Sequence, residues 1–464
     1  MSYIKEKSSK INHQNIIKNE KVKEYLRKCF ISNNTEMITQ IDLTGIKFNK
    51  KNIFSQIENK IKYIIAVDGG YQIVELNTKF PSTKIAFYNV GYIEIDLEKI
   101  KSFEKEQIID PDEFHQVKHF GNYNFVLPVN NIKFQSKNLK DTIRETIYYD
   151  IFVNANIGEF KFLDTLKWLV FEEYDTGNGI FEITCVNDNC NNRIKFEKKN
   201  TYTDEVNNKI ECPVCKTINY ITDIFELHTL VDDYSGASGI VSYVMSIFEV
   251  ILLFTIYKII YIKDKSLLPN ILLIKDGPLA LFSRLDDFQF KKIRPFIKFL
   301  NKLSLDDNQS YVNFVGLDKS GLFVEHLKQI EYKLSNSTLL IPDIYYMKKY
   351  ITGETDSLFG YKTYFGRKML YKHDEKLSFV FDIPLPYLYK HGEPKDYEEY
   401  FGNKPNPNDF INIKNIIQTL IDIKCDLYDN SFLPIALINK AVSLSEKPSS
   451  QLLKLFTKEH LKAK

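Results

Sequence analysis

The sequence has almost no net charge. Its 464 residues include 62 Lys and Arg residues and 60 Asp and Glu residues, so the formal net charge is only +2. This near balance excludes a global electrostatic signature of nucleic-acid binding, and any such binding must depend on local patches of charge. The first residues, MSYIKEKSSK, contain lysines, but no apolar segment follows them. A secretory signal is therefore not expected, and a cytoplasmic location is the default.

The sequence also lacks internal repeats and a Walker A motif, so nothing in it indicates a repeat protein or a P-loop nucleotide site. Apolar residues are not in short supply. Hydrophobic residues make up 44% and aromatic residues 14% of the chain, which predicts a folded globular protein and not a disordered one. The length is compatible with two or three domains, or with one elaborated α/β domain that carries insertions.

A second long apolar run is missing as well. The single run, IVSYVMSIFEVILLFTIYKIIYI at 240–262, is long enough for a membrane span, but it contains Glu249 and Lys258 and three tyrosines. A charge near the centre of a bilayer costs a few kcal/mol on insertion scales. A core helix that carries one functional acid is the favoured interpretation, and a membrane-anchored protein is the alternative, which solubility without detergent would remove.

Two further acids stand at the ends of apolar runs that are typical of buried strands. Asp68 ends the run YIIAVD and is followed by two glycines, and Asp276 ends the run NILLIKD and is followed by Gly277 and Pro278. A buried ionised carboxylate is tolerated only when it is paired or bound to a cation. Together with Glu249 in the apolar helix, these acids therefore suggest a shared metal ion. Such a set is typical of a divalent-metal nuclease.

Four of the six cysteines form two pairs with the spacing of a zinc ribbon. Four residues lie inside the first pair, two inside the second and 21 between the pairs. The predicted ligands of one tetrahedral Zn²⁺ are Cys185, Cys190, Cys212 and Cys215. A structural role is favoured over direct contact with DNA, because a ribbon of this size usually needs zinc to fold. His228 is expected to be an ordinary, partly exposed histidine, and Cys29 and Cys425 are expected to pack as small hydrophobic residues.

The remaining segments predict alternating helices and strands. The expected helices are an N-terminal arm that includes 22–30, then 141–152, 282–302, 411–423 and 433–445, and the expected strands are 62–68, 71–76, 83–96, 311–318 and a hairpin within 360–386. The segment at 62–76 is expected to contain a turn at the sequence DGG. Basic and aromatic residues interleave in 282–302, which is typical of a nucleic-acid-binding helix or, more commonly, of a solvated face over a core stripe.

Five short motifs, in this order, resemble the NurA family of DNA-end-processing nucleases. They are AVDGG with Asp68, SIFEVILL with Glu249, LLIKDGPLAL with Asp276, VGLDKSG, and YFGRKMLYK followed by DIPLP. The match covers most of the chain, and the order of the motifs is more specific than any one of them. The resemblance implies an α/β fold with an RNase H/PIWI-like mixed sheet core, flanking helices and, here, a zinc-ribbon insertion.

The resemblance also implies an organisation and partners. The expected parts are 1–60 as an N-terminal helical arm and lead-in, 61–180 as the first part of the nuclease core, 181–222 as the zinc ribbon, and 223–464 as the second part of the core with C-terminal helices. The implied activity is a DNA nuclease that depends on Mn²⁺ or Mg²⁺. The implied assembly is a homodimer that works with a hexameric HerA-type ATPase and has no contact with a membrane.

The resemblance assigns roles to individual residues. Asp68 and Asp276 would bind the catalytic metal directly, and Glu249 would complete the metal shell or orient the attacking water. The family usually places a histidine in a C-terminal helix, in a stretch resembling PLxLAH, where this chain has Asn439 in FLPIALINKAVSLS. An asparagine offers an amide oxygen to a hard cation but no proton chemistry near neutral pH. Metal affinity or activity is therefore expected to be reduced or altered.

Phosphate groups of DNA are expected to contact three basic residues in the later motifs, Lys319, Arg367 and Lys368. The leading hypothesis is thus a divalent-metal-dependent DNA nuclease, endonuclease or exonuclease, in DNA end processing or anti-phage defence. The alternative is a non-catalytic, NurA-like DNA-binding or scaffold subunit of the same complex, with Asn439 as a sign of decay. The retention of all three acids argues against that alternative.

Overall fold

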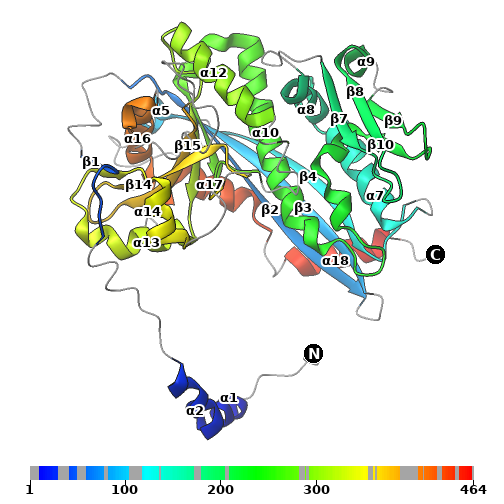
Figure 1. The fold of residues 1–464 in the computed structure, drawn as a ribbon, viewed down its shortest axis with the longest axis horizontal. Coiled ribbons are helices and arrows are strands. Elements are labelled where there is room, and N and C mark those ends of the chain that lie inside the picture. The colour runs from blue at the N-terminus through cyan, green and yellow to red at the C-terminus, as the bar shows by residue number, and fades with distance from the viewer. Residues whose placement is uncertain are drawn as a thin grey trace. The chain divides into compact units, whose positions relative to one another are not determined.

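The computed structural model describes most of the chain (Figure 1). The described residues are 10–29, 41–49, 59–77, 82–103, 118–134, 137–171, 179–203, 208–281, 288, 292–353, 359–360, 363–386, 406–410, 412–425, 431–444 and 449–461. The chain divides into two compact units, Met1–Leu43 and Thr44–Lys464.

The first unit contains two short helices, α1 (Lys10–Lys18) and α2 (Glu20–Lys28). Asn19 separates them and caps α2, because its side-chain oxygen accepts hydrogen bonds from the backbone N–H groups of Lys21 at 3.0 Å and Val22 at 3.4 Å. Cys29 at the end of α2 is exposed, so the expectation that it packs as a small hydrophobic residue is wrong. Cys425, in the second unit, is buried as expected.

A nine-stranded mixed sheet forms the centre of the second unit, so the predicted α/β class with a mixed sheet and flanking helices is confirmed. In spatial order, the strands are β1 (Lys47–Asn49), β13 (Thr338–Leu340), β14 (Gly366–Lys372), β15 (Ser378–Pro384), β12 (Phe314–Asp318), β11 (Ile271–Asp276), β2 (Tyr63–Asn77), β3 (Thr83–Asp96) and β4 (Lys118–Asn130). Strand β11 is parallel to both β2 and β12, and the other neighbours are antiparallel. The predicted hairpin within 360–386 is the antiparallel pair β14–β15.

The DGG sequence does not form the predicted turn. Strand β2 continues through it, and Gly69 and Gly70 pair with Val90 and Asn89 of β3. The glycines instead allow close packing on both faces of the sheet. A Cβ atom on Gly69 would lie 2.3 Å from the sulfur of Met245, and one on Gly70 would lie 2.8 Å from a backbone oxygen of the opposite layer. The two glycines, which predicted a turn, are thus required because larger side chains would collide with the layers above and below the sheet.

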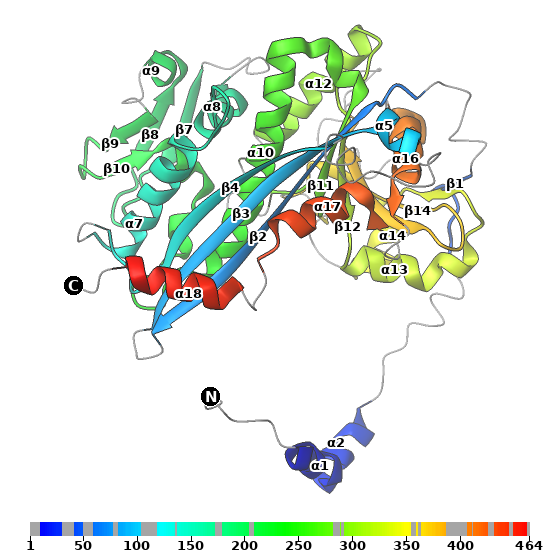
Figure 2. The ribbon, with the colours of Figure 1, turned by 180° about the vertical axis from the view of Figure 1, so that it is seen from behind.

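Helices cover both faces of the sheet. Helix α10 (Val241–Asp264) crosses one face, where α7 (Leu139–Glu145), a π-helical turn (Thr146–Val153), α8 (Phe162–Phe171) and α12 (Arg294–Asp306) join the same hydrophobic core (Figure 1). Helices α16 (Ile413–Asp422) and α17 (Leu433–Val442) pack on the opposite face, and α18 (Ser449–His460) follows them along β2 and β3 (Figure 2). The remaining helices are α5 (Leu97–Phe103), α9 (Lys198–Thr203), α13 (Leu322–Ile330) and α14 (Ile344–Met347).

Helix α10 is buried in the way expected of a core helix. Among the described residues, the one helical segment long and apolar enough to cross a membrane is Ser238–Asn270, and 78% of its most apolar window is buried inside the fold. Most of the segment at 282–291, which was expected to begin a basic amphipathic helix, lies outside the described residues. Helix α12 accounts for the rest of that segment, and its apolar side is buried.

Short two-stranded elements make up the cysteine region and two surface hairpins. Strands β7 (Ile180–Thr184) and β8 (Arg193–Glu197) form one hairpin, and β9 (Lys209–Glu211) and β10 (Ile218–Tyr220) form another. Each hairpin carries one cysteine pair. The other small pairs are β5 (Asn156–Ile157) with β6 (Phe160–Lys161), and β16 (Lys424–Cys425) with β17 (Ser431–Phe432).

Candidate functional site

Two of the predicted acids lie side by side on the same face of the sheet. Strands β2 and β11 are parallel, and Val67 pairs with Lys275, so the next residues along the two strands, Asp68 and Asp276, are neighbours. Side chains alternate between the faces of a strand. Ala66 and Ile274, two positions earlier, both belong to the core beneath α16 and α17. Asp68 and Asp276 therefore face the side of the sheet on which α17 lies.

Asp68 is an acid in an unfavourable electrostatic environment. Its residue is 6% exposed, and one carboxylate oxygen accepts a hydrogen bond from the N–H of Gly69 at 2.7 Å. Burial, followed by the negative charges of Asp276 and Glu249, raises the pKa of Asp68 to about 8. No Lys or Arg side chain among the described residues forms an ion pair with it. A divalent cation would relieve this environment.

Asp276 has a partner in the structure. Its side chain is 12% exposed and forms an ion pair with the ammonium group of Lys319, which follows β12 directly. Lys319 is itself about half exposed, at 46% of its side chain. Of the three basic residues predicted to contact phosphates, Lys319 is thus the one that the structure brings to the acids.

Glu249 approaches from the other face. It lies on α10, whose apolar side chains share a core with Leu273 on β11, so the alternation of that strand points Lys275 toward α10. The Lys275 ammonium lies 2.7 Å from a carboxylate oxygen of Glu249 and also donates a hydrogen bond to the backbone oxygen of Asp276 at 3.0 Å. Burial raises the pKa of Glu249, and the Lys275 charge opposes that shift. Glu249 reaches the neighbourhood of Asp68 where Gly69 leaves space for it.

The three acids are close but do not form a closed shell of ligands. In the part of the chain that the structure describes, the only group of three or more His, Cys, Asp or Glu residues with all ligand atoms within 4.8 Å of one another is the cysteine group. The donor chemistry nevertheless suits a hard cation, because carboxylate oxygens favour Mg²⁺ and Mn²⁺. The buried carboxyl group of Asp68, whose pKa stays raised despite the Lys319 charge, is the feature of the structure that fits such an ion.

Asn439 lies on α17, on the side of the sheet that Asp68 and Asp276 face. It is an exposed residue of α17, and it lines a cavity of about 810 Å³ together with Lys319 and Asp318. The residues Val442 and Ser443, just after it, pack against Gly70 on β2. The structure thus places Asn439 on the same side of the sheet as Asp68 and Asp276.

The predicted phosphate contacts of Arg367 and Lys368 are not supported, because both side chains are buried. Arg367 is 1% exposed and donates a hydrogen bond to the backbone oxygen of Pro342 at 2.9 Å. Lys368 is 5% exposed and forms ion pairs with Asp318, at 2.5 Å, and Asp382, at 3.0 Å. The physical reason is that β14 is an interior strand covered on both faces, so its basic side chains bind buried partners inside the fold and do not reach the surface.

Sequence reasoning missed Lys275 and Asp318. Lys275 interrupts the apolar run NILLIK, and a lysine inside a buried strand is itself a sign of an ion pair. Asp318 ends β12 just as Asp276 ends β11, so the strand-end pattern that identified Asp276 could have identified it too. Its partner Lys368 lies far away in the chain, and the sequence offers no local signal for that pairing.

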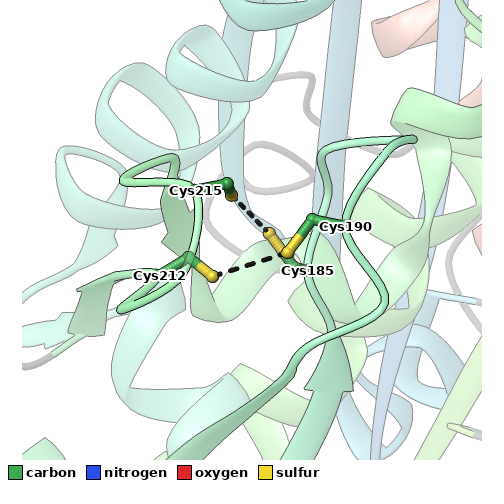
Figure 3. A group of neighbouring side chains, drawn as sticks. All are labelled: Cys185, Cys190, Cys212 and Cys215. Carbon is green, nitrogen blue, oxygen red and sulfur yellow. Dashed lines mark hydrogen bonds between the residues drawn. The ribbon is translucent and has the colours of Figure 1, made fainter.

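The four predicted cysteines come together between the two hairpins (Figure 3). The sulfur atoms of Cys185 and Cys215 lie 3.5 Å apart, and those of Cys190 and Cys212 lie 3.7 Å apart. In a tetrahedral site with Zn–S bonds of about 2.3 Å, neighbouring sulfur atoms would lie roughly 3.8 Å apart. The predicted cluster is confirmed and could bind zinc. Hydrogen bonds with Thr217 lower the pKa of the Cys215 thiol to about 6, whereas burial raises the pKa of the Cys185 thiol to about 12. A bound zinc ion would hold both as thiolates.

A buried ion pair joins the ribbon to the main core. The guanidinium group of Arg144 on α7 donates to both carboxylate oxygens of Asp223, at 2.9 and 2.7 Å, and to the backbone oxygen of Ile218 on β10 at 2.6 Å. His228 lies beside this pair and is not among the four ligand residues, as predicted. It is buried, however, and not partly exposed, and burial lowers its pKa to about 4.

Comparisons with known proteins find similarity in the fold and none in the sequence. No protein-family model matches the chain, and no curated protein is detectably similar to it in sequence. Among solved structures, the chain is similar to that of the NurA nuclease from Sulfolobus solfataricus, with 11% identity and a TM-score of 0.32. The similarity covers 98% of this chain and 97% of that one.

Proposed function

We propose that this chain is a divalent-metal-dependent DNA nuclease in which Asp68 and Asp276 hold the metal ion. The observation that carries the proposal is the placement of two acids side by side at adjacent parallel strands. One of them, Asp68, is buried and forms no ion pair with any residue that the structure describes. Two neighbouring carboxylates in a buried place destabilise the metal-free protein, and a bound cation would remove that cost.

Each residue has a distinct task in this proposal. A bound Mg²⁺ or Mn²⁺ would supply an activated water and neutralise the charge that develops on the phosphate oxygens. Asp68 and Asp276 would bind that ion, and Asp68 would release its proton as it does so. Lys319, half exposed beside Asp276, could exchange its carboxylate partner for a phosphate of the substrate. Glu249, in its ion pair with Lys275, would orient the attacking water or complete the shell.

The finer parts of the proposal depend on the motifs and not on the geometry. DNA as substrate, a homodimer, a hexameric HerA-type ATPase as partner, a cytoplasmic location, and a role in end processing or anti-phage defence are what the resemblance implies. Zinc in the cysteine ribbon would be structural and independent of the catalytic ion.

A nuclease assay with purified full-length protein tests the proposal. Labelled single-stranded and double-stranded DNA would be incubated with and without Mn²⁺ or Mg²⁺, and with and without the partner ATPase. Asp68→Asn and Asp276→Asn should each abolish cleavage, whereas Asp306→Asn, an exposed acid on α12, should retain the wild-type rate. DNA binding without cleavage under every metal condition would favour the non-catalytic alternative. Wild-type rates in either site variant would refute the assignment.

Asn439 gives a second, independent test. A histidine at this position could bind the metal and transfer a proton, whereas asparagine offers only a neutral amide oxygen. Asn439→His should therefore lower the Mn²⁺ concentration needed for half-maximal cleavage, by on the order of 10-fold to 100-fold, judging by the cost of disturbing metal surroundings. Asn439→Ala should weaken activity further. Unchanged metal titrations for both variants would exclude Asn439 from the site.

A further inference from the structure

Lys275 places a fixed positive charge among the acids of the proposed site. It lies on β11, an interior strand between β2 and β12, and is only 4% exposed. Its ammonium group lies 2.7 Å from a Glu249 carboxylate oxygen and donates to the backbone oxygen of Asp276 at 3.0 Å. A lysine is rarely buried to this degree unless it is paired. The proposed function includes no role in metal or substrate binding for the Lys275 ammonium group.

The sheet itself separates two charged compartments. Asp68 and Asp276 face α17, while Glu249 and Lys275 meet on the side of α10. Gly69, which has no side chain, lies between them and lets the Glu249 carboxylate approach to within 3.4 Å of where its Cβ atom would be. Glu249 is therefore near the metal-binding pair, but its nearest cation is the ammonium group of Lys275.

The balance of charge favours a single divalent ion. With all three carboxylates ionised, the ammonium groups of Lys275 and Lys319 leave one net negative charge. One divalent ion and one phosphodiester group would bring the site to neutrality, whereas two divalent ions would leave it with two net positive charges in a largely buried environment. Excess buried charge is strongly unfavourable.

We propose that Lys275 takes the place of a second divalent ion on the α10 side of the sheet, so that the site uses one metal ion. This inference rests on the proposed metal-dependent function. Lys275 acts as a positioning residue: its buried ammonium group forms an ion pair with the Glu249 carboxylate, fixes the position of that carboxylate and neutralises its charge. Removal of the ammonium group should free Glu249 to bind a cation.

Counting bound Mn²⁺ tests the inference without relying on activity. Zinc-loaded protein would be titrated with Mn²⁺, and the bound ions would be counted by equilibrium dialysis and by the loss of the free-ion signal in electron paramagnetic resonance. We expect one Mn²⁺ per chain for the wild type and two for Lys275→Met. The count should return to one in Lys275→Met with Glu249→Gln, and Lys275→Arg should also bind one. Lys292→Met, at another buried lysine whose ammonium donates to the backbone oxygen of Val170, is the matched control and should bind one.

The possible results separate the two proposals. Two ions in the wild type, or one ion in a folded Lys275→Met, would overturn the role of Lys275. Two ions in Lys275→Met without DNA cleavage by any variant would support the role of Lys275 and refute the nuclease. If only Lys275→Met binds an ion, Lys275 blocks the sole cation position and the proposed Asp68–Asp276 metal site is wrong; if neither protein binds one, both proposals fail.

A second variant decides the case if Lys275→Met does not fold. Glu249→Gln alone should keep one bound Mn²⁺ with its affinity changed by less than about 3-fold, because Lys275 and not the ion is the partner of Glu249. A loss of more than about 10-fold in Mn²⁺ affinity, which is the effect of disturbing the groups around a bound metal, would show that Glu249 binds the same ion as Asp68. That result would overturn the inference.

Discussion

Replacing Asp68 by asparagine should stabilise the metal-free protein while it abolishes cleavage. The side chain is buried next to Asp276 and near Glu249, and this environment raises the pKa of Asp68 from an ordinary value of 3.8 to about 8. Between these two values the folded protein binds a proton that the unfolded chain does not. The contribution of Asp68 to the stability of the wild type therefore falls as the pH rises from about 4 to about 8, and it does not rise as it would for a salt-bridged acid.

The size of the effect follows from the shift in pKa. Each pH unit within that range is worth about 1.4 kcal/mol, so at pH 7 the buried carboxyl group lowers the free energy of unfolding by at most about 4 kcal/mol. Asparagine resembles the protonated acid in shape, keeps an oxygen that can accept the hydrogen bond from Gly69, and does not titrate. The gain from Asp68→Asn should be less than about 2 kcal/mol at pH 5 and should reach about 1 to 4 kcal/mol at pH 7.

Urea denaturation of zinc-loaded protein without added Mn²⁺ or Mg²⁺, at several pH values from 5 to 8, measures this difference. Mn²⁺ at about 100 times its dissociation constant should then stabilise the wild type by about 2.7 kcal/mol and leave Asp68→Asn unchanged. Asp306→Asn should follow the wild type throughout. If Asp68→Asn were less stable than the wild type at pH 7.5, or if the two stability curves ran parallel with pH, then Asp68 would not be an uncompensated buried acid and the argument for a metal there would fail.

Three further predictions concern the rest of the fold. Purified protein should contain one zinc per chain and Cys212→Ser should lose it; less than about half an equivalent in the wild type, with freely titratable thiols, would contradict the ribbon. Arg144→Met should lower the free energy of unfolding by about 3–5 kcal/mol because it leaves the buried Asp223 carboxylate without its cationic partner. Asp223→Leu in the same chain should restore most of that loss, an outcome that a purely steric defect would not give. His326, buried against the hydroxyl group of Tyr346, has its pKa lowered by burial from 6.5 to about 4. The contribution of His326 to the free energy of unfolding is therefore fully present above pH 6.5 and is lost as the pH falls toward 4, by up to about 3 kcal/mol. In denaturation experiments at several pH values, His326→Gln should remove that part of the loss of stability in acid.

The sequence by itself determined the features that depend on neighbours along the chain. The spacing of the cysteines predicted the cluster at Cys185, because each pair lies within one hairpin and only the two hairpins have to meet. The long apolar run predicted the buried helix α10, because its composition leaves no polar face for solvent. Asp68 and Asp276 were found because an acid at the end of an apolar strand conflicts with its surroundings wherever that strand is placed.

Only the tertiary structure decided what depends on partners far away in the chain. It determined that Asp68 and Asp276 face α17 while Lys275 faces α10 and its residue Glu249, because the face of a strand residue has meaning only after the layers have packed. It buried Arg367, because the position of β14 inside the sheet follows from its pairing with β13 and β15 and not from its own composition. It paired Lys275 with Glu249 across 26 positions of sequence. The local sequence pattern thus located the charged residues, and contacts between distant parts of the chain determined their ion-pair partners.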